Sequence, residues 1–181
     1  MKKRIVMNLS PKSIRQTEKL LQEYEEKFKD GVRRAVDRAT EELYNKIIEN
    51  CNAGNLGEFT DAIQWEYDKM KNVGRVWVTA EGEGSNGLVI ILNEFGTGKV
   101  KGGKYNEAYA SEHKYKINMS GKGDTGWAFP TKDGTMKWTH GIPSKLMFYE
   151  ACNDVSKEFK DILNIEINGS IGKMYNDERT D

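Results

Sequence analysis

The sequence predicts an α+β fold, in which a long N-terminal helix and a C-terminal helix accompany an antiparallel sheet of four or five strands. Three observations support this prediction. Apolar residues recur every three or four positions near both ends of the chain, shorter apolar runs lie between them, and a glycine turn separates two aromatic segments. Because 181 residues suffice for one core and are few for two, we expect a single domain, residues 1–181.

The longest periodic segment covers residues 10–52. Its apolar residues step by three or four, as on one face of an α-helix: Ile14, Leu21, Tyr24, Phe28, Val32, Ala35, Val36, Ala39, Leu43 and Ile47. Ser10 and Pro11 suit the N-cap and the first turn of a helix. Gly31 costs about 1 kcal/mol relative to alanine in a helix, so we expect a kink or a break there.

The sheet is expected within residues 60–140. Residues 63–68 (IQWEYD) alternate apolar and polar side chains, which is the period of a half-buried strand, and a short helix is the alternative. Residues 75–80 (RVWVTA) and 88–92 (LVIIL) are typical of two further strands. These three segments would form a meander.

Aromatic residues on both sides of Asp133-Gly134 predict a hairpin. The segment GIPS then ends the sheet, and Ser144 is suited to cap a C-terminal helix over residues 144–163 that packs on the sheet. We expect residues 164–181 to form a polar tail. The expected inner face of the sheet and the helix face against it comprise Trp65, Val76, Val78, Val89, Ile91, Trp138, Phe148, Val155 and Phe159.

Residues 99–126 combine six lysines, three acidic residues and five glycines with little periodicity, which predicts a long mobile loop with a short helix near residues 106–113. The lysines could contact DNA phosphates without sequence specificity. We favour a solvated loop, because its tyrosines are not spaced as a base-stacking platform. The lysines concerned are Lys99, Lys101, Lys104, Lys114, Lys116 and Lys122.

The overall composition gives no sign of a membrane, nucleic-acid or metal partner. The chain has 28 basic and 28 acidic residues, so it has no net field that would attract DNA or a lipid surface. Its basic start, MKKRIVMNLS, lacks the apolar run of a signal peptide, and we expect a cytosolic product without membrane association. Cys51 and Cys152 are too few for a disulfide framework and show no zinc-ligand spacing.

No catalytic, cofactor-binding or metal site is predicted. His140 with Glu94 could act as a base and its orienting partner. We favour structural roles, in which His140 hydrogen-bonds the turn into Gly141 and Glu94 pairs with a neighbouring backbone or arginine.

Two glycine runs match G-x-G-x-x-G, at residues 82–87 and 121–126. Such a run holds phosphate when it opens a helix, whereas we expect the first to precede the LVIIL strand and the second to precede WAFP. Turn glycines are therefore the favoured interpretation. The segment GTGK also lacks the first glycine and the Ser or Thr of a P-loop.

Four segments, taken in order, resemble the tail-completion or head–tail joining proteins of long-tailed, siphovirus-type bacteriophages. They are AGNL (53–56), NEFGTG (93–98), GWAFP (126–130) and THGIPSKLMFYEA (139–151). The resemblance extends over residues 11–163 and lies in the order and spacing of these segments. Leu146 is a departure, because the family commonly has proline after the P-x-K step.

The resemblance implies a structural protein of the virion, a neck or minor tail component, that is present in the host cytoplasm during assembly. Its implied partners are copies of itself in a ring and other tail and connector proteins, without a cofactor or catalysis. The candidate assembly residues are Glu94, Phe95, Gly96, Gly98, His140 and Gly141. Phe95, followed by glycines that give no flanking cover, is the expected apolar anchor. A hydrolase or nucleic-acid-binding domain using His140, Glu94 and the loop lysines is the alternative.

Overall fold

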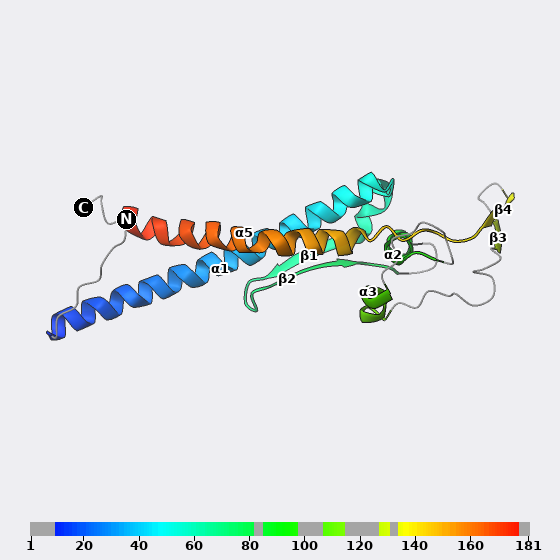
Figure 1. Ribbon diagram of the computed structural model, residues 1–181. Coiled ribbons are helices and arrows are strands. Elements are labelled where there is room, and N and C mark those ends of the chain that lie inside the picture. The colour runs from blue at the N-terminus through cyan, green and yellow to red at the C-terminus, as the bar shows by residue number, and fades with distance from the viewer. Residues whose placement is uncertain (1–9, 82–84, 98–106, 115–126, 131–133, 178–181) are drawn as a thin grey trace. The chain divides into compact units, whose positions relative to one another are not determined.

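The computed structural model describes residues 10–81, 85–97, 107–114, 127–130 and 134–177. The described chain combines helices with short two-stranded sheets (Figure 1). The elements are α1 (Pro11–Ala53), the 3-10 helix η1 (Gly57–Ala62), β1 (Ile63–Asp68), β2 (Val73–Val78), α2 (Asn86–Phe95), α3 (Glu107–Glu112), β3 (Trp127–Pro130), β4 (Met136–Thr139) and α5 (Met147–Asp177).

The chain divides into two compact units. The first unit comprises Met1–Ala39, Tyr67–Gly74 and Lys157–Asp181. The second unit comprises Thr40–Glu66 and Arg75–Ser156. Each unit is described separately below.

Helix α1 confirms the prediction of a long N-terminal helix. Its first turn is capped by the Ser10 hydroxyl, which accepts a hydrogen bond from the Ser13 N–H at 3.3 Å. The helix continues through Gly31, so the expected break into two helices there is wrong, and the kink stays a prediction. A Cβ atom at Gly31 would lie 2.8 Å from the Ile167 Cα, closer than real Cβ contacts come. Gly31 therefore permits a close approach between α1 and α5 in the first unit.

Charged and small side chains surround this close approach. Arg34 contacts Glu166 at 3.4 Å and donates a hydrogen bond to the Ser170 hydroxyl. Arg38 makes a second contact with Glu166 at 3.3 Å. Ala35 of α1 is fully buried in the same unit.

Helix α5 extends well beyond the predicted residues 144–163. It begins at Met147 and continues to Asp177, so the expected polar tail over residues 164–181 is wrong for its helical part. Ile162 and Ser170 are buried in the first unit, which shows that the buried face of the helix continues past Leu163. Packing of this face against α1 gives the polar segment its helical structure.

The sheet is smaller than predicted. β1 and β2 form one two-stranded sheet, and β3 and β4 form another with Trp127 opposite Thr139. No further strand joins either sheet within the described ranges, so a single sheet of four or five strands is wrong. The hairpin near Gly134 is confirmed, and this glycine has the positive φ of 80° that its turn requires.

The missing strand is a helix. Residues 88–92, predicted as a buried strand, lie inside α2. A continuous apolar run cannot by itself distinguish a strand from a buried helix. Here Gly87, Ile90 and Glu94 are buried at intervals of three and four, and the Ser85 hydroxyl accepts a hydrogen bond from the Leu88 N–H at 3.3 Å. The helical spacing and the N-cap decide the structure.

The core of the second unit draws on helices more than on strands. Its buried apolar residues are Ile47, Cys51, Leu56, Ile63, Ile90, Met147 and Ala151. Of the expected inner face, Val76, Val78, Val89 and Phe148 do pack against this core. Trp65, Trp138 and Phe159 are instead exposed. Because α2 is helical, Ile90 is the fully buried residue in place of Ile91.

Candidate functional site

Two of the motif segments run alongside each other just before α5. Thr97 and Ile142 exchange backbone hydrogen bonds of 2.8 and 3.0 Å as an isolated antiparallel bridge. The Lys145 N–H donates to the Asn93 carbonyl at 2.7 Å. Segments NEFGTG and THGIPSK, more than forty residues apart, therefore meet through their main chains.

Glu94 is the residue that joins α2 to α5. Its Oε2 accepts a hydrogen bond from the Phe148 N–H at 2.9 Å, and its Oε1 accepts one from the Tyr149 N–H at 3.0 Å. These N–H groups belong to the first turn of α5, which has no intrahelical acceptors for them. The carboxylate also lies at the positive end of the helix dipole. Glu94 thus caps α5 from another element.

Residue Glu94 is only 3 % exposed. Burial raises its pKa, while the hydrogen bonds from Phe148 and Tyr149 act in the opposite direction. The predicted pairing of Glu94 with a neighbouring backbone is confirmed. The expectation that Ser144 caps the last helix is wrong, because its hydroxyl donates to the Glu94 carbonyl at 2.6 Å and the helix begins only at Met147.

Backbone geometry at this junction restricts which residues fit. Gly96 has φ of 79°, and a Cβ atom there would lie 2.8 Å from the Ser144 nitrogen. Leu146 has φ of 52°, in the left-handed region. Proline, whose ring holds φ near about −65°, could not adopt this conformation. The backbone at residue 146 therefore excludes the proline that the resembled phage proteins commonly have at this position.

A third motif segment, AGNL, meets the same junction at the end of α1. The Lys145 ammonium donates to the Gly54 carbonyl at 2.6 Å, and the Asn50 side-chain amide donates to the Met147 carbonyl at 2.9 Å. The Leu56 N–H closes the end of the helix by donating to the Cys51 carbonyl at 2.8 Å. A hollow of about 350 Å³ lies here, lined by Asn50, Ala53, Gly54, Ser144, Lys145, Met147 and Glu150. We call this region the α5 junction.

Phe95 is not the exposed anchor that the sequence suggested. It is buried, and its ring stacks on Tyr109 of α3 with the centroids 5.2 Å apart. Tyr109 also lies 4.9 Å from the Tyr149 ring of α5 and 4.6 Å from the ring of His113. Phe95 is covered by Tyr109 of α3, a later element of the chain. The glycines that follow Phe95 do not predict this contact.

His140 is exposed, whereas Glu94 is buried and bonded to backbone N–H groups. The hydrogen bonds of the turn at Gly141 come from Thr139, whose hydroxyl accepts from the Gly141 N–H at 3.0 Å and contacts the Gly141 carbonyl at 3.2 Å. The role proposed for His140 in this turn is therefore filled by Thr139. With its carboxylate committed to the cap, Glu94 is poorly suited to orient a catalytic base.

Most of the lysine segment lies outside the described residues. This holds for Lys99, Lys101, Lys104, Lys116 and Lys122, and the candidate assembly residue Gly98 also lies outside the described residues. Lys114 is described, and it is exposed just after α3. The short helix expected near residues 106–113 is confirmed by α3.

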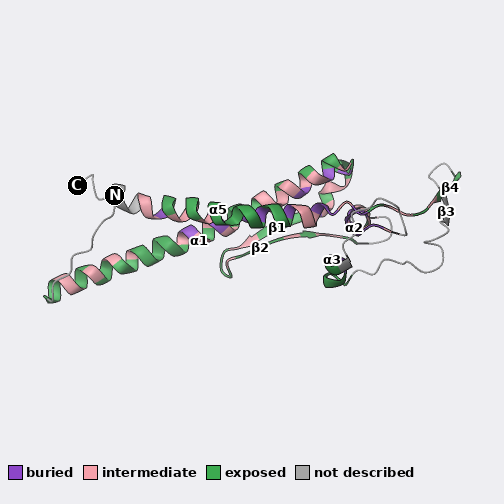
Figure 2. Cartoon of the chain, viewed as in Figure 1, coloured by how far each residue is buried: buried purple, intermediate pink, exposed green. Residues whose placement is uncertain are grey.

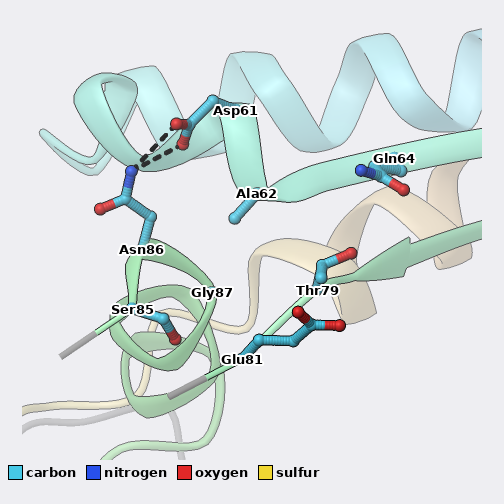
Figure 3. A pocket seen from close by; sticks show the side chains of 8 residues that line it. All are labelled: Asp61, Ala62, Gln64, Thr79, Glu81, Ser85, Asn86 and Gly87. Carbon is cyan, nitrogen blue, oxygen red and sulfur yellow. Dashed lines mark hydrogen bonds between the residues drawn. The ribbon is translucent and has the colours of Figure 1, made fainter. Parts of the chain in front are cut away.

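A second hollow, of about 290 Å³, lies at the start of α2 (Figure 3). The glycine run at residues 82–87 ends in this helix, so the expectation that it precedes a strand is wrong. Asp61 and Glu81 line the hollow, and Asn86 donates to both Asp61 carboxylate oxygens at 2.8 and 3.1 Å (Figure 3). The Ser85 hydroxyl is used as the N-cap. Two carboxylates beside the helix start make a phosphate site unfavourable.

Strand β4 presents the two most exposed large apolar side chains among the described residues of the second unit. Met136 and Trp138 are 64 % and 62 % exposed. They are two positions apart on β4 and therefore share one face of the hairpin. Sequence reasoning placed Trp138 in the core, because periodicity alone cannot tell which face of an isolated hairpin is covered.

Within the part of the chain that the structure describes, no group of three or more His, Cys, Asp or Glu residues is placed to hold a metal ion. Over the same residues, no helix combines the length and apolarity needed to cross a membrane. Comparisons with protein-family models, with curated proteins and with solved structures found no match to this chain.

Proposed function

We propose that this protein is a structural component of a tailed-phage virion, which completes the tail or joins it to the head. It acts by assembly as a ring, in which each copy uses one surface to contact a different surface of the next. Its further partners are neighbouring tail and connector proteins, which it meets in the host cytoplasm during assembly. The order of the four motif segments supports this proposal.

The α5 junction carries the argument from the structure. Three of the segments behind the resemblance interact with one another there, mainly through backbone atoms and the Glu94 carboxylate. Residues used in this way fix how α2 and α5 meet, which suits a protein whose task is to present surfaces. Some of the candidate assembly residues would then support the assembly surface without contacting the neighbour themselves. These are Glu94, Phe95, Gly96 and Gly141.

Direct contact with a neighbour is assigned to the exposed face of β4. Met136 and Trp138 are large, apolar and side by side, as residues that dominate binding energy often are. They replace Phe95 as the proposed anchor, because Phe95 is covered by Tyr109.

Complementation of a phage that lacks this gene tests the proposal. We expect Trp138→Asp to leave the protein folded, since the side chain is exposed, and to yield heads and tails that stay unjoined or tails with irregular ends. Lys137→Asp is the matched control, because Lys137 is also exposed and lies on the opposite face of β4. Normal virions from a folded Trp138→Asp protein would contradict the anchor and weaken the virion role.

A further inference from the structure

Helix α3 contacts α2 and α5 through the side chain of Tyr109. The Tyr109 ring stacks on Phe95 of α2 with the centroids 5.2 Å apart, and it lies 4.9 Å from the ring of Tyr149 of α5. The Tyr109 hydroxyl donates a hydrogen bond to the Glu94 carboxylate. One side chain of α3 therefore touches both longer helices and the carboxylate that caps α5.

Much of α3 faces solvent. Ala110 is buried, whereas Ala108, Ser111 and Glu112 are exposed. Figure 2 shows α3 mainly in the colour of exposed residues, while α2 is mainly buried and intermediate. Isolated helices shorter than about 12 to 15 residues are marginal in water, and α3 has six residues. The helical structure of α3 therefore depends on its contacts with the rest of the chain.

The core of the second unit is built from other elements. Its buried apolar residues belong to α1, β1, α2, α5 and the residue before η1. The backbone bridge between Thr97 and Ile142 and the hydrogen bonds from the Phe148 and Tyr149 N–H groups to Glu94 are made without α3. Separation of α3 would therefore leave the core and the α5 cap in place.

We propose that α3 is a releasable cover over Phe95, which opens while the core of the second unit remains folded. Segments with few buried contacts open at a much smaller free-energy cost than the whole protein. Opening exposes the parts of the Phe95 and Tyr149 rings that Tyr109 covers, together with the Glu94 carboxylate. This surface is thus hidden in the closed chain and accessible only in the open chain. The inference concerns the isolated chain and does not depend on the virion role.

Thiol labelling of the full chain tests the cover. In a Cys152→Ser background, Ala110→Cys places a thiol at a buried position of α3, and the fully buried Cys51 is the internal reference in the core. We expect residue 110 to be labelled at least about tenfold faster than Cys51 in the native protein. Its labelling rate should change little in dilute urea, whereas the rate at Cys51 should rise steeply, because the dependence on urea grows with the surface that opening exposes.

Tyr109→Phe, added to the labelled chain, tests the contact that holds the cover closed. Phenylalanine keeps the ring and loses the hydroxyl that bonds to Glu94. We expect the labelling rate at residue 110 to rise by about tenfold, because a hydrogen bond to a charged group is lost, while the rate at Cys51 stays nearly the same. Ser111→Ala, at an exposed position of α3, is the control and should change the rate by less than about threefold.

Hydrogen exchange of the unsubstituted chain repeats the comparison without a change in α3. The His113 N–H, which donates to the Tyr109 carbonyl at 3.2 Å, should exchange at a rate that dilute urea hardly alters. The N–H of Ala151, a buried residue of α5, should exchange far more slowly and respond steeply to urea.

Equal dependence on urea in α3 and in the core, by either method, would overturn the proposal, because α3 would then open only when the core unfolds. An unchanged labelling rate in Tyr109→Phe would exclude the hydroxyl as a contact that holds α3 closed. Both methods use the isolated protein, so their failure is distinct from a failure of the phage assay.

Discussion

The Glu94 carboxylate accepts a hydrogen bond from the Phe148 N–H at 2.9 Å, although 54 residues separate the two along the chain. A helix N-cap ordinarily comes from the residue that precedes the helix. In this protein it comes from the last turn of another helix, so the start of α5 depends on the correct placement of α2.

Removal of this cap should destabilise the fold. We expect Glu94→Ala to lower the free energy of unfolding by about 2 to 3 kcal/mol, because it removes a cap and leaves the part-buried N–H groups of Phe148 and Tyr149 without this acceptor. Urea denaturation followed by circular dichroism measures the change. Asp161→Ala, at an exposed position of α5, is the control and should alter stability by less than about 0.5 kcal/mol. Equal effects of the two changes would contradict the capping role.

The same carboxyl should make stability depend on pH. Burial raises the pKa of Glu94 above its ordinary value of 4.5, so the folded protein binds this proton more tightly than the unfolded chain does. The stability that the group contributes is therefore complete below the unfolded pKa and is lost as the pH rises through the folded pKa. Relative to Glu94→Gln, which does not titrate, the wild type should lose stability as the pH rises above the ordinary glutamate pKa of 4.5. A difference that changes in the opposite direction would show that the hydrogen bonds outweigh burial.

Two helix glycines should respond oppositely to alanine. At Gly31 a Cβ atom would lie 2.8 Å from the backbone of Ile167, whereas at Gly169 it would meet nothing within 4 Å. Gly31→Ala should destabilise the protein by about 1 to 3 kcal/mol through overpacking. Gly169→Ala should stabilise it by up to about 1 kcal/mol through helix propensity. Thermal unfolding of the pair measures both; stabilisation by Gly31→Ala would mean that α1 and α5 do not approach closely.

The two thiols should differ in reactivity. Cys51 is fully buried with its Sγ 3.6 Å from the Met147 sulfur, and burial raises its pKa to about 11. Cys152 is exposed, although partial burial of its sulfur raises its pKa as well. A thiol reagent at mildly alkaline pH should label Cys152 alone in the native protein and both residues in urea. Mass spectrometry of labelled peptides reads this out, and native labelling of Cys51 would contradict the packing of Met147 on α1.

The sequence predicted best the elements in which the spacing of apolar residues fits only one type of secondary structure. Forty residues of helical spacing indicate α1, and two-residue alternation indicates β1. The apolar run of α2 is compatible with a strand or a helix. The Ser85 cap and Glu94 favour the helix, and the partner of Glu94 is fifty-four residues away. The residues next to Glu94 in the sequence do not predict that partner.

The same limit applies to the candidate site. Three of the motif segments meet at the α5 junction, and the roles of their residues there depend on contacts with residues far away in the sequence. Phe95 was expected to be exposed because its sequence neighbours are small, and Tyr109 covers it from α3. Trp138 was expected to be buried because it is aromatic, and no described element shields it from solvent.

The long-range cap also has a kinetic consequence. A contact that closes a loop of this length loses chain entropy when it forms, so it tends to form late in folding, after the local helices and hairpins. A late contact affects the unfolding rate more than the folding rate. We therefore expect Glu94→Ala to increase the unfolding rate in denaturant and to leave the refolding rate nearly unchanged. A chevron plot in which the mutation slows folding would instead place the cap in the folding nucleus.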